Sequence, residues 1–192
     1  SETTFYSSGV GSDAYPRCPS MDTESAPLSC TVVQPGGEAG EAAAKRGPND
    51  LAMLIYTSGT TGLPKAGTVI HSKMCAPGAA FGVIFGVTHE DRIYTTLPLY
   101  HTAGGMLGIG MHVVNGCTMV LRSKFSASSF MEDCASSKAT VAQYIGELCR
   151  YLLATPPSAS DKKHSLRMML GNGLRPDIWQ AFVDRYGLAE IG

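Results

Sequence analysis

The stretch Tyr56–Lys65 constrains this chain more than any other, because it places a turn of hydroxyl groups and glycines directly after an apolar run. The apolar run, Leu51–Tyr56, is typical of a buried strand. The turn is composed of Thr57, Ser58, Gly59, Thr60, Thr61 and Gly62, and Lys65 follows. Glycine lets backbone N–H groups face an anion, the hydroxyls add donors, and the lysine adds a positive charge. The stretch therefore predicts a polyphosphate-binding loop at the carboxyl end of a strand.

From residue 51 onward, predicted strands and helices alternate along the chain. Strands are expected at 51–56, 67–71, 92–97, 117–122, 140–144 and 166–170. Helices are expected at 72–87, 103–114, 146–154 and 176–186, with a further helix capped by Ser126. Residues 76–87 are the most apolar stretch, which is too short to span a bilayer and is predicted to be a buried, glycine-spaced helix. The alternation predicts an α/β fold with a mostly parallel sheet flanked by helices.

Residues 1–50 have a different composition, rich in serine, glycine, proline, alanine and glutamate. We expect this low-complexity region to be poorly ordered or linker-like, with a turn at 35–40 and a short exposed helix at 41–45, and the domain proper to occupy residues 51–192. The net charge is −1 with scattered basic residues, which argues against nucleic acid binding. The six cysteines form no C-x-x-C pair, so they are expected to be core thiols in a reducing compartment.

Three more turns follow predicted strands and carry candidate site residues. The first contains Tyr100 and His101, the second is Gln143–Glu147 with Tyr144, and the third is Gly171-Asn172-Gly173. Taken alone, a single histidine is more often an ordinary core or surface group, and a tyrosine after a strand is more often a core aromatic. The first of these turns follows a strand that ends at Pro98, and it is expected to face the same edge of the sheet as the loop.

The loop is not the common P-loop, because Leu63 and Pro64 separate Gly62 from Lys65 and Ala66 follows. All ten positions of Tyr56–Lys65 resemble the phosphate-binding loop of the adenylate-forming superfamily of AMP-binding enzymes. The resemblance implies the large amino-terminal domain of that fold, present only in part.

The resemblance also implies roles for the candidate residues. The backbone and hydroxyls of residues 57–62, with Lys65, would hold the phosphates of ATP, with Mg²⁺ near Thr60. His101 would help position the carboxylate or gate an acyl pocket, which makes it the one candidate catalytic residue. Tyr144 would form part of the acyl pocket wall, and Gly171, Asn172 and Gly173 would pack against the adenine.

Three strings narrow the resemblance within the superfamily. They are Phe125–Ser128, Tyr144–Leu153 and Leu170–Arg175, and they are similar to the fatty acid transport proteins, also called very long-chain acyl-CoA synthetases. The implied activity is ATP-dependent conversion of a long- or very long-chain fatty acid to an acyl-adenylate and then to the coenzyme A thioester, coupled to uptake. The family also implies an intracellular, membrane-associated protein (endoplasmic reticulum, peroxisome or plasma membrane) whose membrane attachment lies outside these residues.

Several parts of the family's machinery do not match any residue here. They are an aromatic-Gly-x-Thr-Glu motif that binds adenine and Mg²⁺, a ribose-binding aspartate, and a small carboxyl-terminal lid domain with the catalytic lysine. The chain ends near Glu190 without the Thr of that motif. We therefore expect an incomplete piece that is poorly soluble and inactive alone. Two other hypotheses stay open: a different carboxylate–CoA ligase, such as an aryl or bile-acid ligase, and a truncated non-catalytic protein that binds nucleotide, fatty acid or only partners.

Overall fold

A computed structural model of the chain describes residues 3–6, 45–57 and 65–192. The predicted turn at 35–40 and most of the helix predicted at 41–45 lie outside these residues. The main sheet has six strands in the order β1-β5-β4-β6-β7-β8. Their bounds are Thr3–Tyr6 for β1, Arg92–Thr95 for β4, Thr118–Arg122 for β5, Val141–Ile145 for β6, Met168–Asn172 for β7 and Glu190–Ile191 for β8.

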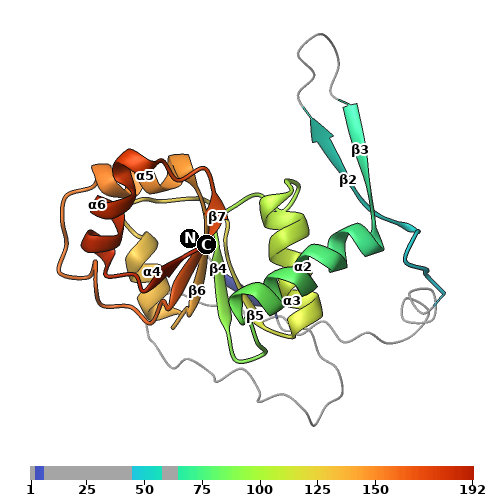
Figure 1. Cartoon of the computed structure of the whole chain (residues 1–192), viewed down its shortest axis with the longest axis horizontal. Coiled ribbons are helices and arrows are strands. Elements are labelled where there is room, and N and C mark those ends of the chain that lie inside the picture. The colour runs from blue at the N-terminus through green and yellow to red at the C-terminus, as the bar shows by residue number, and fades with distance from the viewer. Residues whose placement is uncertain (1–2, 7–44, 58–64) are drawn as a thin grey trace.

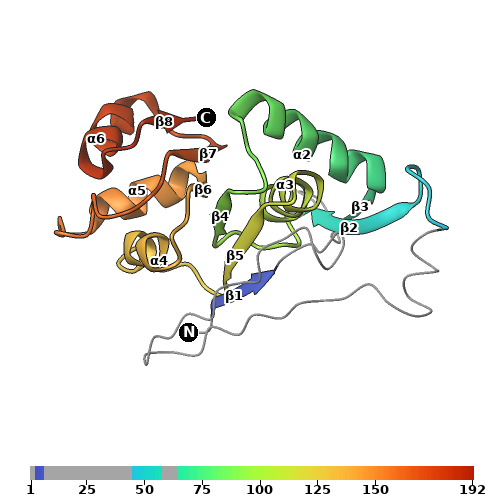
Figure 2. The same ribbon diagram turned by 90° about the horizontal axis from the view of Figure 1, so that it is seen from below.

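Strands β5, β4, β6, β7 and β8 run parallel, which confirms the predicted parallel α/β fold. Strand β1 pairs antiparallel with β5, with Thr3 opposite Arg122. It lies at the sheet edge in Figure 2. The sequence pattern of residues 1–50 does not predict this strand.

Helices cover both faces of the sheet, as Figures 1 and 2 show. One face carries α4 (Phe130–Ser136), α5 (Gly146–Ala154) and α6 (Pro176–Tyr186). The other carries α2 (His71–Phe85), the π-helix η1 (Ala103–Ile109) and α3 (Gly110–Asn115). Successive strand residues alternate between the two cores: Ile93 packs with Met111, whereas Tyr94 packs with Phe130. A parallel sheet buried on both faces explains why its strands are apolar throughout.

Helix α4 begins later than the sequence predicted. Its first residue is Phe130, and Ser129 rather than Ser126 stands at the N-cap position. The Ser126 hydroxyl instead lies 3.2 Å from the Ser128 and Ser129 hydroxyls. Predicted α5 and α6 are confirmed at both ends.

Strands β2 (Leu51–Thr57) and β3 (Lys65–Ile70) form a separate antiparallel hairpin. Figure 1 shows it projecting away from the main sheet. The strand prediction for 51–56 is confirmed, but the expected burial is wrong. In β2 Ile55 is buried, whereas Leu51 and Tyr56 are exposed, at 52% and 61%. A two-stranded hairpin outside the sheet leaves its side chains less covered than a central strand does.

Helix α2 packs on α3 through glycines. A Cβ on Gly78 would lie 2.4 Å from the Gly110 carbonyl, so the two backbones touch. The glycine-spaced helix predicted here is therefore confirmed. Its predicted burial holds only in part, because Val83 and Ile84 are exposed at 86% and 68%. No helix in the described part of the chain is long and apolar enough to cross a membrane.

Candidate functional site

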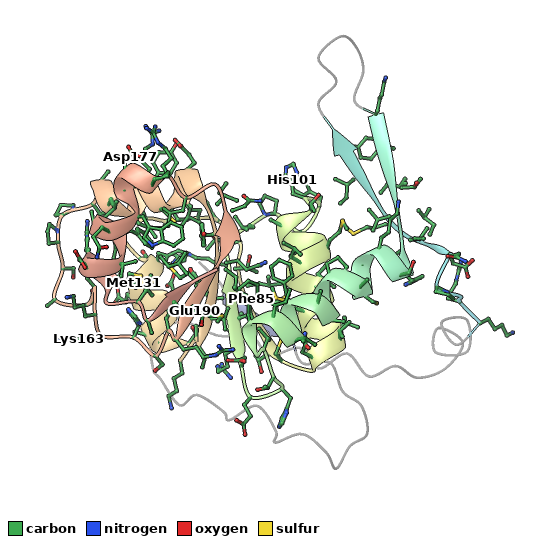
Figure 3. The ribbon with its side chains drawn as sticks, in the orientation of Figure 1. Phe85, His101, Met131, Lys163, Asp177 and Glu190 are labelled. Carbon is green, nitrogen blue, oxygen red and sulfur yellow. The ribbon has the colours of Figure 1, made fainter. Side chains whose placement is uncertain are left out.

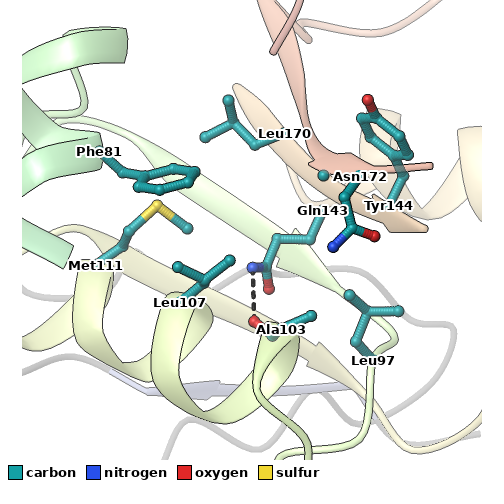
Figure 4. Close-up of a pocket in the computed structure, with 10 residues that line it drawn as sticks. Phe81, Leu97, Ala103, Leu107, Met111, Gln143, Tyr144, Leu170 and Asn172 are labelled. Atoms are coloured by element: carbon teal, nitrogen blue, oxygen red, sulfur yellow. Dashed lines mark hydrogen bonds between the residues drawn. The ribbon is translucent and has the colours of Figure 1, made fainter. Parts of the chain in front are cut away.

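A small pocket opens where the carboxyl ends of β6 and β7 meet the segment that follows β4 (Figure 4). Its lining is mostly apolar, with two amide side chains and one phenol. The lining residues are Phe81, Leu97, Ala103, Leu107, Met111, Gln143, Tyr144, Leu170, Gly171 and Asn172. The pocket holds space for about one water molecule. An apolar ligand larger than this therefore enters only if a wall moves.

Two of the turns singled out from the sequence meet in this pocket. Tyr144 comes from the end of β6, and Gly171 and Asn172 come from the end of β7. Tyr144 is opposite Gly171 in the parallel register. The structure therefore brings Tyr144, Gly171 and Asn172 together at one edge of the sheet.

The Tyr144 side chain is buried, and its hydroxyl donates to the Gly192 carbonyl at 3.2 Å. Burial raises the pKa of this phenol above its ordinary value, with a smaller contribution from Cys149. Tyr144 is therefore a neutral donor at physiological pH.

The turns after β6 and β7 pack backbone against backbone. A Cβ on Gly146 would lie 1.7 Å from the Gly173 carbonyl oxygen, and one on Gly171 would lie 2.1 Å from the Tyr144 carbonyl. Gly173 also has a φ of +75°, which favours glycine. Gly173 therefore shapes the turn next to the pocket without lining it.

His101 does not line the pocket. It lies on the exposed turn before η1, where its ring packs against Tyr100 with centroids 4.8 Å apart. Figure 3 shows the side chain pointing outward from this end of η1. The backbone N–H of His101 donates to the Pro98 carbonyl at 3.1 Å, and this hydrogen bond fixes the turn.

The hairpin reaches the same turn region. A Cβ on Gly105, in η1, would lie 3.1 Å from the Met53 methyl of β2. Thr57 pairs with Lys65, so the two ends of the predicted phosphate loop are held together by the hairpin ladder. The loop residues Ser58, Gly59, Thr60, Thr61 and Gly62 lie outside the described residues.

No group of three or more histidine, cysteine, aspartate or glutamate residues that could hold a metal occurs in residues 3–6, 45–57 and 65–192. Thr60, the residue expected near Mg²⁺, is not among them. The described donors alone therefore do not make a protein cage for a metal.

Gln143 precedes Tyr144 in the second turn, and no role of its own was predicted for it. It is 2% exposed, and its Nε2 donates to the Ala103 carbonyl at 3.0 Å (Figure 4). Its Oε1 is buried without a hydrogen-bond partner in the described structure. One signal was available in the sequence: Gln143 is the only amide in the otherwise apolar strand Val141–Ile145.

A family model described as AMP-binding enzyme matches residues 12–192. The chain belongs to the AMP-binding enzyme family. Among this family's curated members, it is 43% identical to long-chain fatty acid transport protein 1 of Bos taurus, over 98% of this chain and 28% of the bovine protein. It is 52% identical to long-chain fatty acid transport protein 2 of Rattus norvegicus, over 73% of this chain and 22% of that protein. The AMP-binding chain thus spans about a quarter of the length of these relatives.

Solved structures of other adenylate-forming proteins share the fold. ATP-bound MatB from Rhodopseudomonas palustris matches with a TM-score of 0.64 and 24% identity, covering 86% of this chain and 36% of MatB. O-succinylbenzoate coenzyme A synthetase from Bacillus subtilis in complex with AMP matches with a TM-score of 0.63 and 21% identity, covering 86% of this chain and 35% of that enzyme. The AMP-binding chain therefore has part of the amino-terminal domain fold of adenylate-forming enzymes.

Proposed function

We propose that the whole protein activates a long- or very long-chain fatty acid with ATP and passes the acyl group to coenzyme A. The observation that carries this proposal is the apolar pocket at the carboxyl edge of β6 and β7, in a chain of the AMP-binding family. Similarity to long-chain fatty acid transport proteins supports a fatty acid as the substrate. In the proposed reaction, the carboxylate attacks the α-phosphate of ATP and pyrophosphate leaves. The thiol of coenzyme A then attacks the acyl carbon and AMP leaves.

Each predicted residue takes a role in this proposal. Residues 57–62 donate hydrogen bonds to the phosphates, and Lys65 adds positive charge beside them. The transferred groups are stabilised mainly by such fixed donors, because charge builds up on oxygen during both steps. Mg²⁺ would neutralise phosphate charge near Thr60.

Tyr144 and the apolar lining would hold the acyl group, and Asn172 with its flanking Gly171 and Gly173 would lie against the adenine. His101 is on the exposed turn next to the pocket, a position that suits a group meeting the carboxylate after substrate binds. We also propose membrane association of the whole protein, through residues other than the helices described above.

The proposal is tested by purifying the whole protein and measuring thioester formation with ATP, Mg²⁺ and coenzyme A. The panel of acids contains straight-chain acids of increasing length, an aryl acid and a bile acid. We expect thioester formation with long straight chains. Thioester formation only with the aryl or bile acid would favour a different carboxylate–CoA ligase, and no product with any acid would contradict the ligase proposal.

A further inference from the structure

The π-helix η1 changes its hydrogen-bond register just after His101. The Gly105 N–H donates to the His101 carbonyl at 2.7 Å, four residues back. The Leu107 N–H donates to the Thr102 carbonyl at 3.0 Å, five residues back. π-helical turns are rare, occur mostly as single-turn insertions in α-helices, and are frequent at functional sites. A backbone register of this kind persists where its surroundings hold it in place.

Gln143 supplies such a contact from the neighbouring strand. Its Nε2 donates to the carbonyl of Ala103. Ala103 directly follows His101 and Thr102, whose carbonyls accept the hydrogen bonds at which the register changes. Gln143 is 2% exposed and the hydrogen bond is partly buried, so little water competes for it. Strand β6 therefore fixes the first turn of η1 through one side chain (Figure 4).

The other half of the same amide indicates that Gln143 does more than stabilise the fold. Its Oε1 is buried without a partner in the described residues, and a buried acceptor without a partner destabilises a protein. Methionine has a similar length and shape and would not bury an unpaired oxygen there. The amide is therefore costly at this position, which favours a role for it in the site.

We propose that Gln143 is a specificity-determining residue that sets the width of the acyl pocket by holding η1 in its π register. Ala103 and Leu107 form the helix side of the pocket, and Gln143 faces them. A return to α-helical register would rotate the Ala103 and Leu107 side chains by about 100° relative to the residues that follow η1. The inference rests on the proposed function, because it takes this pocket as the acyl site.

Two variants of the whole protein test the proposal from opposite sides of the contact. Gln143→Met removes the donor to Ala103 at nearly constant size. Gly108→Ala keeps the amide but displaces it, because the new Cβ would lie 2.8 Å from Gln143 Oε1. Gln180→Met, at an exposed position on α6, is the matched control.

The first readout is the ratio of kcat/KM for a methyl-branched acid to kcat/KM for a straight acid of equal length. We expect both test variants to raise this ratio by at least about fivefold, the size of one hydrogen bond, and Gln180→Met to leave it unchanged. A merely structural role would lower both rates together. An unchanged ratio in folded Gln143→Met and Gly108→Ala proteins would overturn the proposal and leave the ligase proposal intact.

The second readout does not need activity. Amide hydrogen exchange at Ala103–Ile109 should be at least about tenfold faster in Gln143→Met than in the unaltered protein, because the helix loses its contact with β6. Unchanged exchange would overturn the positioning role. If the unaltered protein activates no acid at all, the proposed function fails and the specificity role fails with it, whatever the exchange result.

Discussion

Asp91 and Arg167 form a two-pronged ion pair, with Arg167 Nε 3.1 Å from Asp91 Oδ1 and Nη2 2.9 Å from Oδ2. Asp91 immediately precedes β4 and Arg167 immediately precedes β7, so the pair joins the amino ends of two strands that flank β6. Thr140, just before β6, donates to Asp91 Oδ1 at 2.6 Å. The network therefore holds the end of the sheet opposite the candidate site.

Replacing Asp91 by asparagine should destabilise the protein by about 1–2 kcal/mol, because the buried Asp91 carboxylate loses its charge-assisted hydrogen bonds and solvent screens part of the effect at the 38% exposed Arg167. Asp177→Asn is the matched control, because Asp177 forms an ion pair with Arg175 in which both side chains are mostly exposed. That change should cost less than about 0.5 kcal/mol. Denaturant unfolding of the whole protein measures both, and equal losses would contradict the structural role of the Asp91 pair.

Stability should fall as the pH drops below neutral because of His112. Burial lowers the pKa of this imidazole, partly opposed by its contact with the Cys117 carbonyl. The folded state thus takes up its proton at lower pH than the unfolded state does. The stability that depends on a neutral His112 is fully present above the unfolded pKa of about 6.5, and it is lost as the pH falls below that value.

His112→Gln should remove this pH dependence. We expect the free energy of unfolding of the unaltered protein to decrease between about pH 7 and pH 5, with a smaller slope in the variant. Denaturant titrations at several pH values give the two slopes. Identical slopes would mean that His112 does not titrate differently on folding.

The turns after β6 and β7 allow no side chain at Gly146. Gly146→Ala would place a Cβ 1.7 Å from the Gly173 carbonyl, so one turn must move. We expect a loss of about 3 kcal/mol or more in stability and a weaker response to nucleotide. Gly86→Ala is the control: its Cβ meets nothing within 4 Å, and its φ of +59° should cost only about 1 kcal/mol. Thermal unfolding ranks the two, and an equal or reversed order would contradict the close approach.

Lys65 begins β3 directly after the predicted phosphate loop. If it adds charge beside the phosphates, Lys65→Ala should weaken ATP binding by about tenfold or more, as for loss of a charged hydrogen bond. Lys73→Ala, at an exposed position on α2, should leave affinity unchanged. Calorimetric titration with ATP decides this, and unchanged affinity in Lys65→Ala would remove the residue from the site.

Sequence patterns predicted the fold well where local signals and packing agree. Helix α5 begins at Gly146 and ends before Pro156, and α6 begins at Pro176 and ends before Gly187, where proline and glycine mark the boundaries. The start of α4 was predicted too early, because Ser126 satisfies its hydroxyl with neighbouring serines rather than with the helix end. The apolar residues Leu51–Tyr56 do not indicate that this strand lies outside the main sheet.

The candidate site was predicted only in part. Tyr144, Gly171 and Asn172 were singled out through the family resemblance, and the structure brings them together because they lie at the ends of neighbouring parallel strands. Phe81 and Met111 were missed and Gln143 was given no role of its own, since their meeting depends on how α2, η1 and α3 pack over the sheet. That packing is a tertiary relationship, and the π register of η1 leaves no distinct mark in the glycine-rich sequence Ala103–Ile109.

The most direct test of the central claim is the fate of ATP in the absence of coenzyme A. The whole protein is mixed with ATP, Mg²⁺ and a labelled long-chain fatty acid, and the products are resolved. The account predicts pyrophosphate and enzyme-bound acyl-adenylate in about equal amounts, both dependent on the fatty acid. Formation of ADP, or release of pyrophosphate that does not depend on the acid, would contradict it.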